Sequence, residues 1–216
     1  MSIKLEVWGD YALFSRPELS VERVSYDIVT PSAARGILEA IYWHPGMRWR
    51  VDKIYLLAPI GYTNIRRNEV KAKASGSKVR SVMNGADGKD LYINAKDEIQ
   101  QRASMVLKDV HYVIEAHFDM TDKAHEGDNP GKFQDIIKRR IKKGQCYHTP
   151  YFGCREFPVN YRLYDFPSVP TVNENKDLGI MLYDMDYSDL ENIKPMFFRA
   201  VLENGVIDLT QCEVYK

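Results

Sequence analysis

Residues 21–60 decide the fold, and they read VERVSYDIVTPSAARGILEAIYWHPGMRWRVDKIYLLAPI. Within this stretch Thr30 can cap a helix, and Pro31 suits the first helical position. The apolar residues that follow recur at the i, i+3, i+4, i+7 spacing of one helix face, namely at Ala34, Ile37, Leu38 and Ile41. Pro45-Gly46 closes the pattern, so the sequence predicts one helix between two strand-like runs.

Further strands and one more helix are expected along the chain. The expected strands lie at residues 3–14, 49–57, 61–73, 110–120 and 180–187. The second helix should run from Asn129-Pro130 to Gly144, and Asn204-Gly205 should turn a hairpin. Residues 74–90 contain glycines among small and polar residues, which predicts a mobile loop. Strand–helix–strand taken twice is the order of an α+β, ferredoxin-like sandwich with insertions, here followed by a small antiparallel β-sheet domain.

Composition indicates an ordinary soluble protein. The chain has 216 residues, of which 44% are hydrophobic and 28% charged. The segment MSIKLEVWGD lacks the basic and apolar regions of a signal peptide, and no apolar run is long enough to span a bilayer. The cysteines form no CxxC pair. We therefore expect a cytoplasmic protein with reduced thiols and no membrane partner.

The formal net charge is zero, but the charges are unevenly distributed. Residues 1–164 carry 26 Lys and Arg against 20 Asp and Glu, whereas residues 165–216 carry 4 against 10. This asymmetry coincides with the expected division into a domain at 1–164 and a second at 165–216. Two basic clusters, at 61–80 and 132–143, hold six basic side chains each. The pattern predicts oriented binding to a polyanion, and a merely solvated charged surface is the alternative.

The polar face of the strand at 110–120 invites a metal-site hypothesis. It carries His111, Glu115, His117 and Asp119. His111 and His117 are six residues apart, roughly 20 Å along a strand, so they cannot share one ion. A metal site at His117 would need ligands from elsewhere, and a polar sheet face is the simpler interpretation.

Cleavage of RNA without a metal ion needs a group that accepts the 2′-hydroxyl proton, a group that protonates the departing 5′-oxygen, and a cation for the phosphorane. Histidine suits the first two needs, and Lys or Arg suits the third. Helical spacing places Tyr42 at the edge of the apolar stripe, half-buried beside Arg35. His44 and His111 are further candidates, and spacing alone selects no set of three.

Five blocks of sequence closely resemble the CRISPR-associated family-five protein of subtype I-C, a RAMP protein that processes CRISPR repeat RNA. They are WGDYALFSRPE (8–18), VERVSYDIVTPSAARGILEAIYWHP (21–45), NIRRNEV (64–70), QRASMVLKDVHYVIEAHF (101–118) and GCREFP (153–158). The resemblance covers nearly the whole chain. It implies a ferredoxin-like (RRM/RAMP) domain with a glycine-rich loop, here near residues 144–154, and a small C-terminal β-sheet domain.

The resemblance also implies an activity and partners. The activity is metal-independent cleavage of pre-crRNA at the base of the repeat stem-loop, without a cofactor. The protein would stay bound to the 5′ handle of the crRNA, together with other subunits of the type I-C interference complex. A non-catalytic subunit that binds the handle, or a divalent-dependent DNA nuclease, are the alternative functions.

The resemblance assigns catalysis to a Tyr late in the first helix and to a Lys-His pair at the start of the strand after the inserted loop. These fall on Tyr42 and Lys108, but Asp109 stands where the pattern has His. His111 is the nearest substitute, although on a regular strand it points away from Lys108. Residues expected to bind RNA are Arg35, Arg66, Arg67, Arg102, Lys138, Arg139, Arg140, Gly153 and Arg155.

Overall fold

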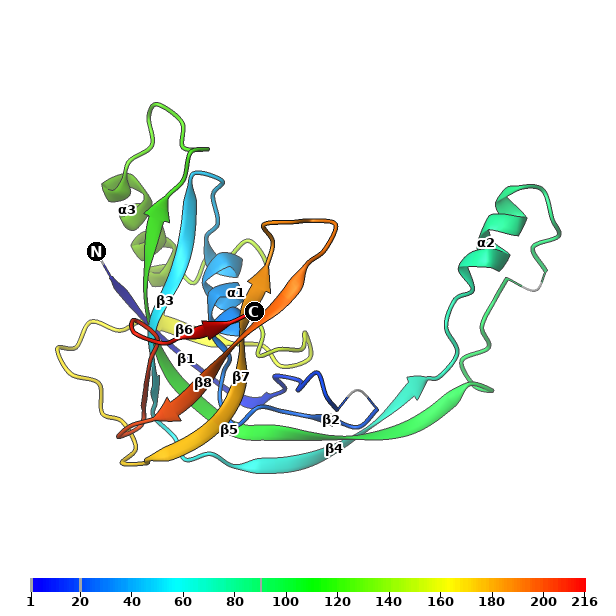
Figure 1. Cartoon of the computed structure of the whole chain (residues 1–216), viewed down its shortest axis with the longest axis horizontal. Coiled ribbons are helices and arrows are strands. Elements are labelled where there is room, and N and C mark those ends of the chain that lie inside the picture. Colours follow the sequence, from blue (N-terminus) through cyan, green and yellow to red (C-terminus); the bar gives the residue numbers. More distant parts are fainter. Residues whose placement is uncertain (1, 20, 90) are drawn as a thin grey trace.

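The computed structural model describes residues 2–19, 21–89 and 91–216. Its central element is strand β5 (Ile99–Met120), which is 22 residues long. Strand β1 (Ile3–Ala12) pairs antiparallel along one edge of β5. Strands β3 (Met47–Leu56) and β4 (Tyr62–Val70) follow one another along the other edge, also antiparallel (Figure 1). Sequence patterns predicted a strand only from residue 110, so the first half of β5 is a correction.

Three short strands complete this sheet. Strand β6 (Asn160–Leu163) pairs with β1, and β9 (Val206–Asp208) pairs with β3, which gives the order β6-β1-β5-β3-β9. Strand β2 (Arg23–Val24) pairs in parallel with β5. The sheet is therefore antiparallel except for this one short contact.

The two predicted helices are confirmed, and local sequence explains both. Helix α1 (Pro31–Ile41) begins where the Thr30 hydroxyl accepts a hydrogen bond from the Ala33 amide, at 3.2 Å. Its predicted apolar stripe is buried and packs between β3 and the second sheet. Helix α3 (Pro130–Lys142) is capped by Asn129 and buries Phe133 against the core. Within the described ranges, every helix is too short or too polar to cross a membrane.

The C-terminal segment forms a second, three-stranded antiparallel sheet. Its strands are β7 (Lys176–Asp186), β8 (Lys194–Leu202) and β10 (Val214–Tyr215). Asn204 and Gly205 turn the chain with φ values of 49° and 75°, as predicted. The predicted hairpin partner is wrong, because β9 leaves β8 and joins β3 in the large sheet. The division into domains at residues 164 and 165 stays a prediction.

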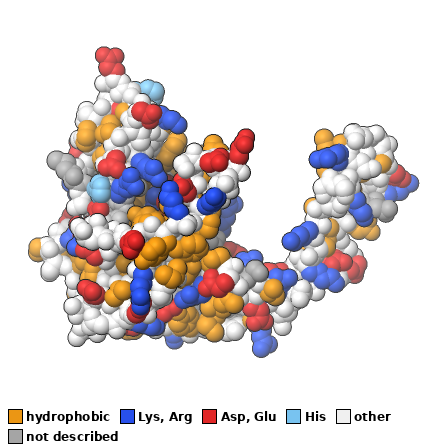
Figure 2. All heavy atoms as spheres, in the orientation of Figure 1, with side chains coloured by type: hydrophobic (Ala, Val, Ile, Leu, Met, Phe, Trp, Pro, Cys, Tyr) orange, Lys and Arg blue, Asp and Glu red, His pale blue; other side chains and the backbone are white. Residues whose placement is uncertain are grey.

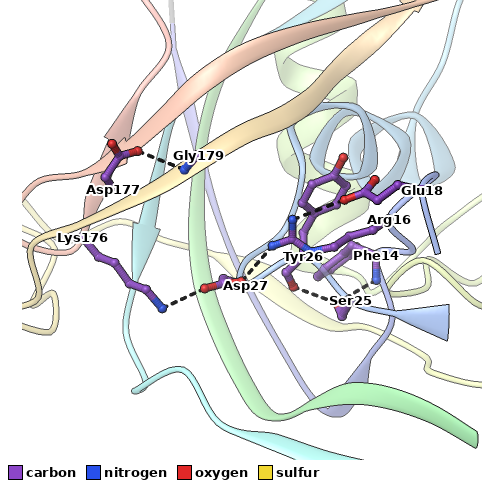
Figure 3. A network of polar contacts seen from close by, with 9 residues as sticks. All are labelled: Phe14, Arg16, Glu18, Ser25, Tyr26, Asp27, Lys176, Asp177 and Gly179. Atoms are coloured by element: carbon purple, nitrogen blue, oxygen red, sulfur yellow. Dashed lines mark hydrogen bonds and ion pairs between the residues drawn. The ribbon is translucent and has the colours of Figure 1, made fainter. Parts of the chain in front are cut away.

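Charged contacts attach the second sheet to the first. Asp27 accepts hydrogen bonds from Arg16 at 3.1 Å and from Lys176 of β7 at 2.8 Å (Figure 3). The guanidinium of Arg16 also lies 4.6 Å from the centre of the Tyr26 ring. A single carboxylate thus ties the segment before α1 to the start of β7.

A second contact at this junction joins α1 directly to β7. Arg35 of α1 donates to both carboxylate oxygens of Asp184 in β7, at 2.9 and 2.8 Å, and to Glu39 at 2.6 Å. This planar, two-pronged geometry is the one in which Arg binds a carboxylate most strongly. Three of the guanidinium's nitrogens are therefore already engaged by carboxylates.

An arm extends from the body of the protein. It consists of β4 and the first half of β5, and it carries helix α2 (Gly76–Met83) at its far end (Figure 1). Residues 74–90 were predicted to be a mobile loop, and α2 corrects that prediction. The Ser75 hydroxyl accepts from the Lys78 amide at 3.3 Å, a helix cap that the glycine-rich composition obscured.

We expect the contact between Arg35 and Asp184 to stabilise the junction measurably. In Arg35→Ala, Asp184 keeps a mostly buried charge without its partner, so the free energy of unfolding should fall by about 2–3 kcal/mol. Urea denaturation measures this. The matched control is Arg50→Ala, since Arg50 and Asp119 form an exposed pair whose loss should cost less than about 1 kcal/mol. Equal losses in the two variants would contradict the assignment.

Candidate functional site

Tyr42 lies at the C-terminal cap of α1 and is buried, with only 8% of its surface exposed. We predicted a half-buried ring beside Arg35, and the structure corrects both points. Phe133 of α3 covers the ring, with the two centroids 6.1 Å apart, and the nearby cation is Arg140, 5.3 Å from the ring centre. Burial raises the pKa of the Tyr42 hydroxyl, and the cations of Arg140 and Lys132 oppose this only in part. The hydroxyl is therefore a proton-bearing hydrogen-bond donor at neutral pH.

Lys108 lies in the middle of β5 and not at its start. The next residue, Asp109, has a φ of 52°, which is the left-handed region that non-glycine residues seldom adopt. This distortion lies where β5 changes partner, because Lys108 donates its amide to Gly61 before β4 while His111 accepts from Leu57 after β3. Lys108 is exposed, and its aliphatic stem lies against Gly61.

The structure does not bring Tyr42 and Lys108 together. The carbonyl of Tyr42 accepts a hydrogen bond from the Trp49 indole at 3.0 Å, and Trp49 pairs with Phe118 of β5. Phe118 and Lys108 are ten residues apart, which is roughly 33 Å along a strand. The two residues that the resemblance implicates therefore occupy separate locations.

His111 lines a groove of about 360 Å³ on the sheet. Its Nε2 lies 2.8 Å from Glu6 of β1, and Glu6 also accepts two hydrogen bonds from Arg162. Glu6 is only 3% exposed. Burial opposes its charged form, but the hydrogen bonds from Arg162 and His111 outweigh burial and hold the pKa of this carboxyl below its usual value. His111 lies opposite Trp8 and Lys108 opposite Tyr11, but the pairing skips Asp109, whose left-handed φ lies between them. That the two side chains point to opposite faces stays a prediction.

The arm presents the first predicted group of RNA-binding residues. Arg67 and Arg102 are cross-strand neighbours, and with Arg23 they surround Glu69 at 3.5 to 3.9 Å. Glu156 also lies 3.1 Å from Arg67, so two carboxylates face three guanidinium groups and a single positive charge is left in excess. Arg66 is exposed on the other face and forms no ion pair with the described residues. Figure 2 shows Lys and Arg side chains along the arm and around its tip.

The second predicted group lies on α3 and the loop that follows it. Arg139 and Arg155 are exposed, and Lys138 is half-buried. Arg140 has a structural contact, because it donates to the Ile41 carbonyl at the end of α1, at 2.9 Å. Gly153 has a φ of 78°, and a Cβ there would collide with the Leu13 carbonyl. Glycine is therefore required at 153 by packing alone.

A cavity of about 390 Å³ lies between α1, this loop and β7. Gly153, His148 and Tyr151 line it from the loop, and Arg35 and Asp184 line it from α1 and β7. Because carboxylates hold Arg35, an RNA phosphate would have to displace one of them. RNA binding by Arg35 stays a prediction.

A pair of histidines adjoins Tyr42. His44 follows α1, and its ring centre lies 4.9 Å from that of Phe133 and 6.0 Å from that of His125. His125 belongs to the loop between β5 and α3. Sequence reasoning proposed His44 as a candidate but missed His125, which is 81 positions further along the chain. The one available signal was that HPG (44–46) and DKAHEGDNP (122–130) both have the composition of turns, and this does not predict that the two loops meet.

The polar face of β5, all of which lies within the described residues, does not assemble a set of metal ligands. His117 lies 2.8 Å from Asp52 and 3.7 Å from Asp119. Among residues 2–19, 21–89 and 91–216, no group of three or more His, Cys, Asp or Glu side chains is arranged to hold a metal ion.

Comparison with known proteins gives a consistent set of relatives. A family model described as CRISPR-associated protein (Cas_Cas5) matches residues 2–210. A protein of Mannheimia succiniciproducens named CRISPR pre-crRNA endoribonuclease Cas5d is 51% identical over 213 residues, covering 96% of this chain and 94% of that protein. A Thermus thermophilus protein with the same name is 45% identical, covering 86% of this chain and 73% of that protein.

Solved structures share the fold. One described as a CRISPR-associated protein aligns over 100% of this chain and 97% of its own, with a TM-score of 0.70 and 23% identity. A functionally uncharacterised protein of Streptococcus mutans aligns over the same shares with a TM-score of 0.68 and 23% identity. The family model and the two sequence relatives together show that this chain belongs to the CRISPR-associated Cas5 family, as a protein of the Cas5d type, the family-five member of subtype I-C.

Proposed function

We propose that this protein is an endoribonuclease of CRISPR antiviral defence that cleaves pre-crRNA within its repeats. The observation that carries the proposal is the identity of 51% over 96% of the chain to a protein named for that activity. Cleavage occurs at the base of the repeat stem-loop and needs no metal ion or other cofactor. The 2′-hydroxyl attacks the adjacent phosphorus, so the products carry a 5′-hydroxyl and a 2′,3′-cyclic (or 3′) phosphate.

The proposal extends to fold type, location and partners. The strand order β6-β1-β5-β3, with α1 and α3 between successive strands, supports a ferredoxin-like core for the N-terminal domain. The protein works in the cytoplasm and stays bound to the 5′ handle of the crRNA within the type I-C interference complex. The acidic C-terminal residues would avoid RNA and suit contacts with other subunits.

Basic residues in two places hold the RNA. On the arm these are Arg66, Arg67 and Arg102, and beside the body they are Lys138, Arg139 and Arg155. Arginine matches phosphate with paired donors, and single-stranded RNA gains further affinity from positive grooves. Gly153 contributes by letting the loop backbone pass close to the chain at Leu13.

Two locations compete as the cleavage centre. The first is built around Tyr42, with Arg140 and Lys132 near its ring. The second lies around Lys108 and His111, where Glu6 and Arg162 hold His111 in the groove. One phosphodiester can react at only one of them, since the two are separated by roughly 33 Å of strand.

Cleavage should survive removal of metal ions and should require the 2′-hydroxyl. Purified protein is incubated with one repeat RNA in EDTA, and the products are separated on a denaturing gel. We expect one cut with the end groups given above, and none in a substrate whose scissile ribose is 2′-deoxy. Cutting of the deoxy substrate, or loss of cutting in EDTA, would refute the mechanism.

Two observations favour a second candidate function, in which the protein only binds the handle. Asp109 replaces the expected histidine, and Tyr42 lies far from Lys108. In that case the same assay would leave the RNA intact in EDTA while a gel shift still shows binding. Activity with DNA that depends on a divalent ion and is lost in His117→Ala would instead support a DNA nuclease.

Substitutions distinguish the two centres. Single-turnover cleavage is measured at saturating protein. We expect Tyr42→Phe to slow cleavage by about 100-fold, as when one preorganised hydrogen-bond donor is removed. Lys108→Ala should instead weaken binding and reduce its salt dependence by about one phosphate contact, with the saturated rate little changed.

Matched controls come from the C-terminal sheet. Tyr215→Phe and Lys194→Ala remove the same groups from exposed positions remote from both centres, so both should cleave normally. A normal rate in Tyr42→Phe with a large loss in Lys108→Ala and His111→Ala would move the chemistry to the groove at His111.

A further inference from the structure

We propose that His44 and His125 are the acid–base pair of the cleavage reaction at the Tyr42 centre, an inference that rests on the endoribonuclease activity proposed above. Tyr42 alone cannot act as the base, because burial raises the pKa of its hydroxyl. Histidine is the side chain whose ordinary pKa suits both halves of such a proton transfer. The pair lies beside Tyr42, with Phe133 in contact with both Tyr42 and His44.

Packing at Gly46 brings the two histidines together. A Cβ at Gly46 would lie 2.8 Å from the Cα of Ala124, so glycine is needed for the close approach of the two loops. Thr121 stabilises that approach with two hydrogen bonds. Its amide donates to the Gly46 carbonyl at 3.0 Å, and its hydroxyl donates to the Pro45 carbonyl. The neighbours of these residues, His44 and His125, therefore face one another at the rim of the sheet.

Asp128 gives the two histidines different environments. Its carboxylate lies 3.9 Å from Nδ1 of His44 and accepts the backbone amide of His125 at 3.0 Å. In the structure Nδ1 of His44 accepts the Gly46 amide at 3.0 Å, so the proton of the neutral ring lies on Nε2. We assign His44 as the acid, with Asp128 as the carboxylate that faces the ring when both nitrogens carry a proton. Among residues 2–19, 21–89 and 91–216, the ring nitrogens of His125 have no hydrogen-bond or ion-pair partner. The His125 ring is exposed, so RNA can reach it, and we assign His125 as the base.

Cations for the phosphorane are present on α3. Lys132 lies 2.9 Å from Asp128, and the guanidinium of Arg140 lies over the Tyr42 ring. Lys132 is about half exposed, so it can exchange its carboxylate for an RNA phosphate. Around the histidines, Asp128 faces His44 and Lys132 pairs with Asp128. Tyr42 and Arg140 are connected to His44 through the ring of Phe133.

The proposed step balances in protons and bonds. His125 takes the proton of the 2′-hydroxyl while the 2′-oxygen forms its bond to phosphorus. The bond between phosphorus and the 5′-oxygen breaks, and protonated His44 gives its proton to that oxygen. The reaction leaves a 2′,3′-cyclic phosphate and a 5′-hydroxyl. His44 ends neutral and His125 protonated, and exchange with water restores the starting states.

The test is single-turnover cleavage by His44→Gln and His125→Gln in EDTA at saturating protein. Each variant should lose about 10²–10⁴-fold in rate, the usual worth of one general acid or base, with RNA affinity unchanged within about threefold. The rate–pH profile of the wild type should be bell-shaped, and each variant should lose one limb. His117→Gln, which changes a histidine held by Asp52 on β5 and outside both loops, is the control and should keep wild-type activity.

A modified substrate separates acid from base. With sulfur in place of the scissile 5′-oxygen, the leaving group needs no proton. His44→Gln should then cleave nearly as fast as the wild type, whereas His125→Gln should stay slow. Thermal unfolding of each variant checks that the loops remain folded.

The outcomes separate this inference from the proposed function. Wild-type rates in both variants, on a protein that cuts repeat RNA in EDTA, would overturn the histidine pair and leave the endoribonuclease intact. A loss of rate that follows a loss of RNA binding, or one that the sulfur substrate restores equally in both variants, would also overturn it. Failure of the wild type to cut would instead refute the proposed function itself.

Discussion

Backbone pairing along both edges of β5 is the constraint on which the rest of the structure depends. A strand of 22 residues exposes a long ladder of amides and carbonyls, and burying them unpaired would cost far more than the fold can supply. β1 and β2 cover one edge, and β4 and β3 cover the other in succession. The distortion at Asp109 lies where β4 gives way to β3 as partner. One strand thus belongs to the arm at one end and to the helix-covered body at the other.

Features set by local sequence could be predicted, and features set by distant pairing could not. Thr30, Pro31 and the apolar stripe lie within one segment, and α1 forms as they indicate. By contrast, β9 follows a correctly predicted turn but pairs with β3. This pairing depends on the free edge of β3 in the large sheet, which no local pattern reveals. The start of β5 lacks a regular apolar alternation because it lies in the arm, where Ile99, Gln100 and Gln101 are all exposed and neither face is buried against the core. Composition likewise hid α2, whose cap is a single serine.

The candidate site divides in the same way. Helical geometry predicted a half-buried Tyr42 at the edge of the apolar stripe, but the ring is buried, and its cationic neighbour is Arg140, 98 positions further along the chain. Arg35, the neighbour expected from the helix surface, is held by Asp184 of the second sheet. The distance from Tyr42 to Lys108 depends on the length of β5, which no local pattern revealed. His125 meets His44 only because Gly46 lets two loops touch.

In the proposed function, RNA binding by the arm and cleavage at the histidine pair lie at opposite ends of β5. Its first residues lie in the basic arm, and the loop after its last residue carries His125, so the arm and the histidine pair are roughly 70 Å apart along the strand. Electrostatic attraction between exposed charges falls off within about 10 Å at ordinary salt. Charge on the arm therefore cannot tune the protonation of the histidine pair, and in the proposed function its role is limited to RNA binding. Asp184, an acidic residue of the second sheet, has a structural role, because it forms an ion pair with Arg35 inside the junction. A chain with no net charge can still present local basic surfaces, here on the arm and on α3, because the excess of acids lies in residues 165–216.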